Sequence, residues 1–280
     1  MGAWVMAGVT FREAARKKVL WMALAAGLAF LALFGTGLYF QLKDFSHRFP
    51  LPVVREGISG FLMVGLYAVD LMAILMTVLT SVDTLSGEIA SGTVQAVATK
   101  PITRRTLLMG KWLGFVAMLT VYVALMVGGI TALTYVLSAH FSTGVTARHL
   151  LRGASLIWLE CILLLTVTFF FGTWLSTLTN GVVALGLHGL AFIGGWIEQA
   201  GAMTHSPRAV EVGVVASLIM PSEALWRRAA FEMQSPLVGS FNFSPFSNAS
   251  VPSLAMIVYA GLYLLVALGL ALRHFGKRDL

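Results

Sequence analysis

The sequence predicts an all-α polytopic membrane protein that forms a single domain over residues 1–280. Hydrophobic residues make up 58% of the chain, the mean hydropathy is +0.85, and only 11% of the residues are charged. Soluble globular proteins are apolar at only about 45–50% of positions. Long apolar runs recur along the chain, and a helix of about 20 apolar residues spans a bilayer. We therefore predict six transmembrane helices.

A short amphipathic segment precedes the first apolar run, and we expect an elbow helix over residues 10–18. Thr10 and Glu13 match a capping box, in which the Thr side chain caps the helix start and the Glu reaches back to it. The basic residues that follow indicate either a plain orientation signal or an interfacial helix that touches a partner. They are Arg12, Arg16, Lys17 and Lys18.

The predicted spans are separated by polar segments. They cover residues 19–40, 58–82, 107–138, 154–178, 182–197 and 252–272. Charges and prolines in residues 41–57 predict an exposed loop, and a tight turn is expected over 176–181. In the fifth span, recurring small residues favour close helix approach. They are Gly181, Gly186, Gly189, Gly194 and Gly195.

The longest non-spanning stretch, residues 198–250, is expected to be an extracytoplasmic loop before the last span. Within it, Val210 to Met220 is apolar but too short to cross the bilayer as an ordinary helix, which predicts a re-entrant or surface-lying segment. Ser222 is then expected to cap an amphipathic helix with Glu223 in its first turn.

Charge bias predicts the orientation. Six spans place both termini on one side, and the basic residues on that side lie close to the span ends, where positive charge marks the cytoplasmic face. We therefore predict an N-in/C-in topology, which puts residues 83–105 in the cytoplasm. The net charge of +7 belongs to these loops and does not indicate nucleic-acid binding.

Three ionisable residues fall inside predicted spans, namely Asp70, Glu160 and His188. An acidic side chain at mid-bilayer costs about 2.5–3.5 kcal/mol on insertion scales, so it should face a cavity or a partner. These residues either line a polar translocation pathway or hydrogen-bond to neighbouring helices and fix the packing. Glu160 lies nearer the outer end of its span, where interfacial water is within its reach.

Several kinds of chemistry are excluded by missing patterns. Gly110 and Lys111 are followed by Trp112, and no glycine stands at the spacing of a phosphate-binding loop, so the chain has no nucleotide-binding motif of its own. His188 has no metal-ligand spacing, and the single Cys161 excludes a disulfide framework. We expect no metal and no directly bound cofactor.

The polar segment between the second and third spans carries the most specific pattern. An acid is followed by glycine and threonine, then proline, arginine and a glycine–lysine pair, at Glu88, Gly92, Thr93, Pro101, Arg104, Gly110 and Lys111. With the basic amphipathic start, six spans and a long outer loop, this order resembles permease subunits of type-2 ABC transporters (the ABC-2 family). The Pro221–Leu225 segment is most similar to the permeases grouped with multicopper-enzyme maturation.

The resemblance implies how such a protein is driven. Two permease subunits, identical or different, form a dimer in the plasma membrane. Two copies of a cytoplasmic ATPase hold ATP and Mg²⁺ and dock on a coupling helix in residues 83–105. The resemblance assigns ATPase coupling to Glu88, Gly92, Thr93, Pro101, Arg104, Gly110 and Lys111. The physical chemistry agrees, since Gly92 allows a chain break, Pro101 stops a helix, and Thr103 can start the next one.

The predicted function is therefore a permease subunit of an ATP-driven transporter, most simply an exporter. Two alternatives remain, a non-transporting mechanical adaptor driven by an ATPase, and an intramembrane enzyme that uses Asp70, Glu160 and His188. The membrane lipids that surround the protein are a further expected partner. The substrate class stays open, because apolar spans suit lipids, drugs and peptides equally.

Overall fold

The computed structural model describes residues 2–16, 18–90, 103–138, 145–234 and 250–277, which are helical almost throughout. The helices are α1 (Gly2–Arg16), α2 (Lys18–Arg48), α3 (Leu51–Ala90), α5 (Arg104–Leu137), α6 (Ala147–Gly172), α7 (Thr177–Met203), α8 (Pro207–Ile219), α9 (Ser222–Met233) and α10 (Leu254–Lys277). Six of them, α2, α3, α5, α6, α7 and α10, are long and apolar enough to cross a membrane. The predicted all-α fold with six spans is confirmed.

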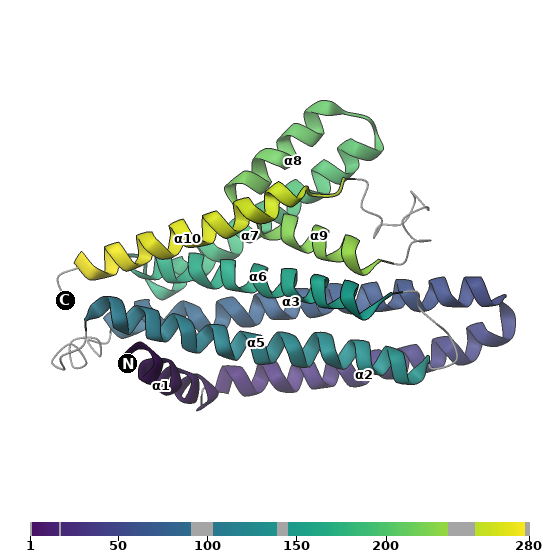
Figure 1. Ribbon diagram of the computed structural model, residues 1–280, viewed down its shortest axis with the longest axis horizontal. Coiled ribbons are helices and arrows are strands. Elements are labelled where there is room, and N and C mark those ends of the chain that lie inside the picture. The colour runs from purple at the N-terminus through teal and green to yellow at the C-terminus, as the bar shows by residue number, and fades with distance from the viewer. Residues whose placement is uncertain (1, 17, 91–102, 139–144, 235–249, 278–280) are drawn as a thin grey trace.

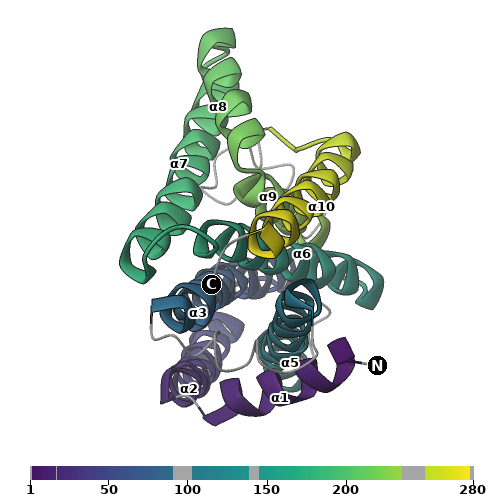
Figure 2. The ribbon, with the colours of Figure 1, turned by 90° about the vertical axis from the view of Figure 1, so that its left-hand side faces the viewer.

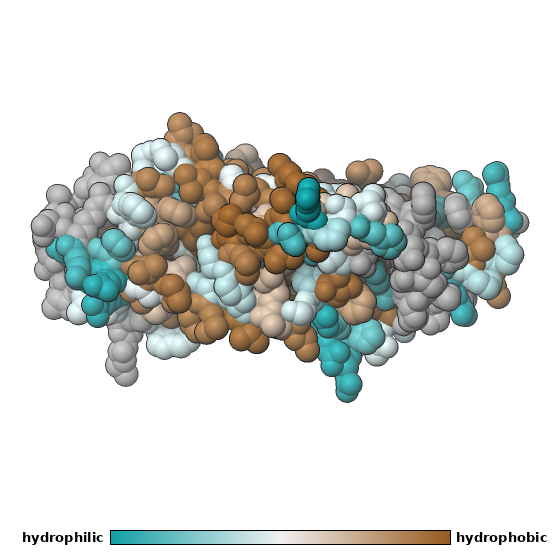
Figure 3. Space-filling view, turned by 90° about the horizontal axis from the view of Figure 1, so that it is seen from above, coloured by the Kyte–Doolittle hydropathy of each residue, from teal (hydrophilic) through white to brown (hydrophobic). Residues whose placement is uncertain are grey.

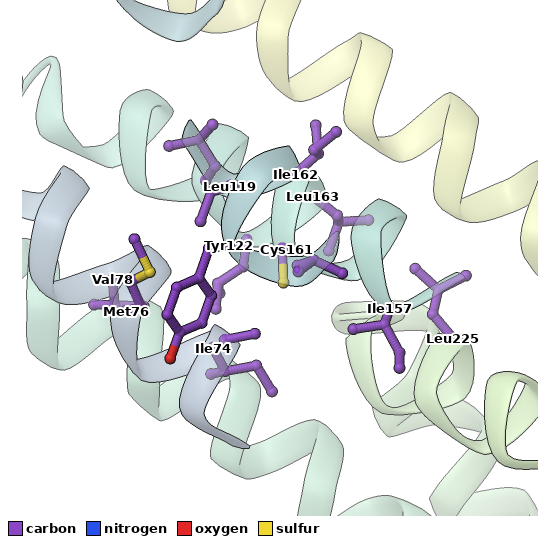
Figure 4. Packing of buried hydrophobic residues seen from close by; sticks show 14 of the residues in the cluster. Ile74, Met76, Val78, Leu119, Tyr122, Ile157, Cys161, Ile162, Leu163 and Leu225 are labelled. Carbon is purple, nitrogen blue, oxygen red and sulfur yellow. The ribbon is translucent and has the colours of Figure 1, made fainter. Parts of the chain in front are cut away.

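Helix α6 lies at the centre of the molecule, between α3 and α5 on one side and α7, α9 and α10 on the other (Figure 2). Five consecutive residues, Cys161 to Leu165, are at most 3% exposed. A helix that is apolar on all sides is typically buried. Figure 4 shows the packing around α6, where side chains of α3, α5 and α9 converge.

The amphipathic helix α1 lies across the ends of the spanning helices and packs on α5 (Figure 2). Contact is close because Gly114 of α5 has no side chain, and a Cβ there would lie 2.8 Å from the Ala7 carbonyl oxygen. The predicted start at Thr10 is wrong. Helix α1 begins at Gly2, and Thr10 is a buried mid-helix residue that faces α5.

The expected loop over residues 41–57 is also wrong, because helix occupies most of it. Helix α2 runs to Arg48 and α3 begins at Leu51. Pro52 is the second residue of α3, where the missing proline N–H has no intrahelical partner to lose. The α2–α3 hairpin projects beyond α5 (Figure 1). Seen from above, apolar residues cover much of the middle of the molecular surface (Figure 3).

The boundary between the fourth and fifth spans differs from the expected one. Helix α6 ends at Gly172, so Leu178 belongs to α7 instead. Ser176 is the N-cap of α7, and its Oγ accepts a hydrogen bond from the Thr179 backbone N–H at 3.4 Å. The polar residues expected in a tight turn therefore start a helix.

Helices α8 and α9 form a re-entrant hairpin with a bend of 108° between them. Helix α8 runs antiparallel to α7, since Ala216 packs at Gly194 and Ala209 packs at Gly201. Helix α9 runs parallel to α7. Ser222 at its start contacts His188, and Arg227 further along contacts Glu198, which also lies further along α7. The predicted re-entrant segment therefore lies in a bent helix pair that runs back along α7 and then turns. Both termini lie at the same end of the bundle (Figure 1).

Candidate functional site

Two regions contain the residues to which the sequence assigned a function. The first is the end of the bundle where α3 stops and α5 starts, near both termini (Figure 1). Glu88 belongs to the last turn of α3, and Arg104 is the first residue of α5. Gly92, Thr93 and Pro101 lie outside the described residues.

The start of α5 has the predicted cap. Thr103 has extended backbone angles, and its Oγ1 accepts a hydrogen bond from the Thr106 backbone N–H at 3.3 Å. Gly110 and Lys111 follow within two turns and are both buried, Lys111 at 5% exposure.

A side-chain tie that sequence reasoning missed joins the end of α3 to the start of α7. The Ser86 and Thr177 hydroxyl oxygens are 3.0 Å apart, and Thr177 Oγ1 donates to Asp83 Oδ1 at 3.4 Å. Asn180 is fully buried, and its Nδ2 donates to the carbonyl oxygens of Val82 at 3.4 Å and Thr168 at 3.0 Å. An asparagine among the polar residues of the expected turn was the available signal.

The second region lies inside the membrane-spanning part, where the structure brings Asp70, Glu160 and His188 together. The carboxyl groups of Asp70 in α3 and Glu160 in α6 are within hydrogen-bonding reach of each other. The His188 Nδ1 atom in α7 lies 3.9 Å from Glu160 Oε1. Glu160 is 0% exposed, so the expectation that it reaches interfacial water is wrong.

Two residues of α9 complete this cluster and were not predicted as part of it. Ser222 was expected to cap α9, but Pro221 occupies the cap position, and the Ser222 Oγ instead lies 3.0 Å from His188 Nδ1. Glu223 is 4% exposed and lies within electrostatic range of Asp70 and Glu160. The bend after Met220 thus brings Ser222 to His188 of α7 and Glu223 near the acids of α3 and α6.

The geometry does not match a catalytic triad. Ser222 Oγ and Glu160 Oε1 approach the same nitrogen of His188, whereas a triad needs the nucleophile and the acid on opposite ring nitrogens. Among the described residues, no group of His, Cys, Asp and Glu side chains has the arrangement of a metal site. The cluster can hold and move protons or contact a polar ligand.

A buried ion pair fixes the re-entrant hairpin next to this cluster. Arg227 Nη2 of α9 donates to Glu198 Oε2 of α7 at 2.8 Å, and both side chains are at most 6% exposed. Ser250 Oγ donates to the other oxygen of Glu198 at 2.5 Å. Opposite charges in adjoining apolar segments were the sequence signal for this pair.

Comparison with known proteins covers nearly the whole chain. Residues 4–280 match the model of a family described as "ABC-2 family transporter protein". No curated protein matches the chain at a significant level. The family match does not distinguish the multicopper-enzyme-maturation group, which stays a prediction.

Proposed function

Because the chain belongs to the ABC-2 family of transporter proteins and is a membrane-spanning permease subunit of an ABC transporter, we propose that a separate cytoplasmic ATPase drives it through residues 83–105. The ATPase holds ATP and Mg²⁺, and its nucleotide-dependent movement pushes on the segment that joins α3 to α5. The residues proposed for this contact are Glu88, Gly92, Thr93, Pro101 and Arg104, whereas Gly110 and Lys111, which are buried in α5, are proposed to couple through the packing of that helix.

The observation that carries this proposal is the tie between α3 and α7. Asp83 and Ser86 belong to the last turns of α3, directly before the proposed docking segment, and both interact with Thr177 at the start of α7. A rigid helix transmits displacement along its length. A movement of the end of α3 therefore shifts α7 as well.

Helix α7 leads from this tie to the intramembrane cluster. His188 of α7 contacts Ser222 of the re-entrant hairpin, and Glu198 of α7 holds Arg227 of the same hairpin. We propose that Asp70, Glu160 and His188 line the translocation pathway and that the hairpin opens or closes it. Ionisable residues inside a membrane protein commonly mark such pathways.

The complete transporter is proposed to contain two permease subunits, identical or different, and two ATPase subunits in the plasma membrane, and to export its substrate. Family membership supports this arrangement. The many apolar side chains exposed on α7 and α10 also suit contacts with lipid or a second permease. They include Leu185, Ile193, Trp196, Val258, Leu262 and Leu265.

The test is stimulation of the ATPase by the reconstituted permease. Thr177→Val keeps the side-chain shape but removes the hydroxyl that contacts Ser86 and Asp83, so we expect normal ATPase binding with stimulation strongly reduced. Gly92→Pro is expected to lose stimulation through the docking segment. Thr131→Val is the matched control, because the Thr131 hydroxyl bonds only the backbone of its own helix among the contacts described.

Wild-type stimulation in both Thr177→Val and Gly92→Pro would contradict the proposal. Substrate flux into proteoliposomes separates an exporter from a mechanical adaptor, since only the exporter moves substrate without a further membrane protein.

A further inference from the structure

Three carboxyl groups from three helices meet at the bend of the re-entrant hairpin. Asp70 of α3, Glu160 of α6 and Glu223 of α9 are 5%, 0% and 4% exposed. Within the described part of the chain, Asp70 Oδ1 and both oxygens of Glu160 have no N–H or O–H group that donates to them. The described structure therefore leaves several buried acceptor atoms without a donor.

A proton supplies the missing donor. An isolated ionised carboxylate in an apolar interior is strongly disfavoured, and two carboxylates within hydrogen-bonding reach cannot both be ionised at low cost. Asp70 and Glu160 are within that reach, and Glu223 adds a third acidic group nearby. A proton on one carboxyl lets it donate to the next.

We propose that Asp70, Glu160 and Glu223 form a proton-binding site, and that proton occupancy holds the hairpin α8–α9 against α3 and α6. This proton-binding site belongs to the permease chain alone and does not depend on the ATPase or on a transported substrate.

Nearby charged and titratable groups do not replace the proton. The Arg227 guanidinium lies within electrostatic range of Glu223, but it also donates to Glu198 at 2.8 Å, so its charge is shared with that carboxylate. A single imidazole at His188 balances at most one of three carboxylates. The groups that surround the site are Tyr67 of α3, Tyr122 of α5, Cys161 of α6, His188 and Glu198 of α7, and Arg227 of α9.

The position of Glu223 links the site to hairpin movement. It stands in the first turn of α9, directly after the 108° bend. Its side chain lies over Gly195 of α7, where a Cβ would be 2.6 Å from Glu223 Cγ. Loss of the shared protons places like charges on α3, α6 and α9. Their repulsion is relieved when α9 moves away.

Hydrogen–deuterium exchange of the purified permease in lipid nanodiscs tests the linkage. After correction for the intrinsic pH dependence of amide exchange, we expect exchange in residues 207–233 to rise severalfold as the pH increases. The double variant Asp70→Asn/Glu160→Gln carries neutral amides that imitate protonated carboxyls, so its hairpin should stay protected at every pH. Glu211→Gln, an exposed change on α8, should behave as the wild type.

Infrared spectroscopy of the wild-type chain provides the second readout and needs no variant to fold. A protonated carboxyl gives a C=O stretching band that shifts in D₂O, and we expect such a band at neutral pH. Glu160→Gln should weaken it while Glu211→Gln leaves it unchanged. The proposal is overturned if the wild-type hairpin exchanges independently of pH or if the protonated-carboxyl band is absent.

Discussion

The buried pair of Arg227 and Glu198 shows how one residue sets the position of the re-entrant hairpin. The 2.8 Å contact joins α9 to α7 in a region where neither side chain exceeds 6% exposure. Removing one partner of such a pair leaves a buried charge and costs about 3–5 kcal/mol. We expect Arg227→Met to lower the thermal unfolding temperature markedly, measured in detergent by intrinsic fluorescence.

The double variant Arg227→Met/Glu198→Met should recover much of that loss, because it removes both charges together. Arg208→Met is the control, since Arg208 is exposed at the start of α8 and should shift the unfolding temperature little. Equal shifts in Arg227→Met and Arg208→Met would mean that the pair does not stabilise the hairpin.

At the same scale, the sequence predicted part of the intramembrane cluster. Asp70, Glu160 and His188 stood out because a charge within an apolar run is costly, and the structure brings them together. Glu223 was missed as a member because it lies two residues after Pro221 and was interpreted only as part of a helix start. A single sequence carries no record of which helices pack, so the direction in which Glu223 points could not be derived from it.

Among the elements, the α7–α8 contact depends on particular glycines. A Cβ at Gly194 would lie 2.2 Å from the Ala216 Cβ, whereas one at Gly189 meets nothing within 4 Å. We expect Gly194→Ala to destabilise the protein by about 1–3 kcal/mol through overpacking. Gly189→Ala, on the same helix, should be neutral or stabilising by about 0.5–1 kcal/mol.

Thermal unfolding of both glycine variants checks this contrast. Similar unfolding temperatures would show that α8 can move away from α7 without loss of stability. That result would contradict the close packing of the hairpin. Hydrogen–deuterium exchange of residues 207–219 should rise in Gly194→Ala and remain at the wild-type level in Gly189→Ala.

Existence and type of the helices were predicted well, and their ends were not. The long apolar runs specify spanning helices because unsatisfied backbone groups are too costly in lipid. The 41–57 segment was misassigned because charge and proline were taken to mean loop, although Pro52 fits the first turn of α3. Likewise, all five glycines of the fifth span suggested close packing. In the structure, Gly194 and Gly195 are close to side chains of α8 and α9 that a Cβ would meet, and the sequence alone does not show where those helices pack.

At the scale of the whole molecule, the arrangement links both proposed sites through α7. Its first turn is tied to the end of α3, its middle contacts the carboxyl cluster, and its last turns hold the hairpin. If the ATPase acts on residues 83–105 as proposed, one continuous helix joins that input to the cluster. This requires the α3–α5 end of the bundle to face the cytoplasm.

Cysteine accessibility in intact cells tests that orientation. Single cysteines are placed by Arg12→Cys, Lys43→Cys and Arg208→Cys in a Cys161→Ser background, because Arg12, Lys43 and Arg208 are exposed and the native Cys161 is buried. Arg12 lies in α1 at the terminal end of the bundle, whereas Lys43 and Arg208 lie toward the opposite end. With N-in/C-in topology, a membrane-impermeant maleimide should label the cysteines at 43 and 208 from outside and the cysteine at 12 only after permeabilisation. The reverse pattern would place the α3–α5 end outside, and a cytoplasmic ATPase could not dock there.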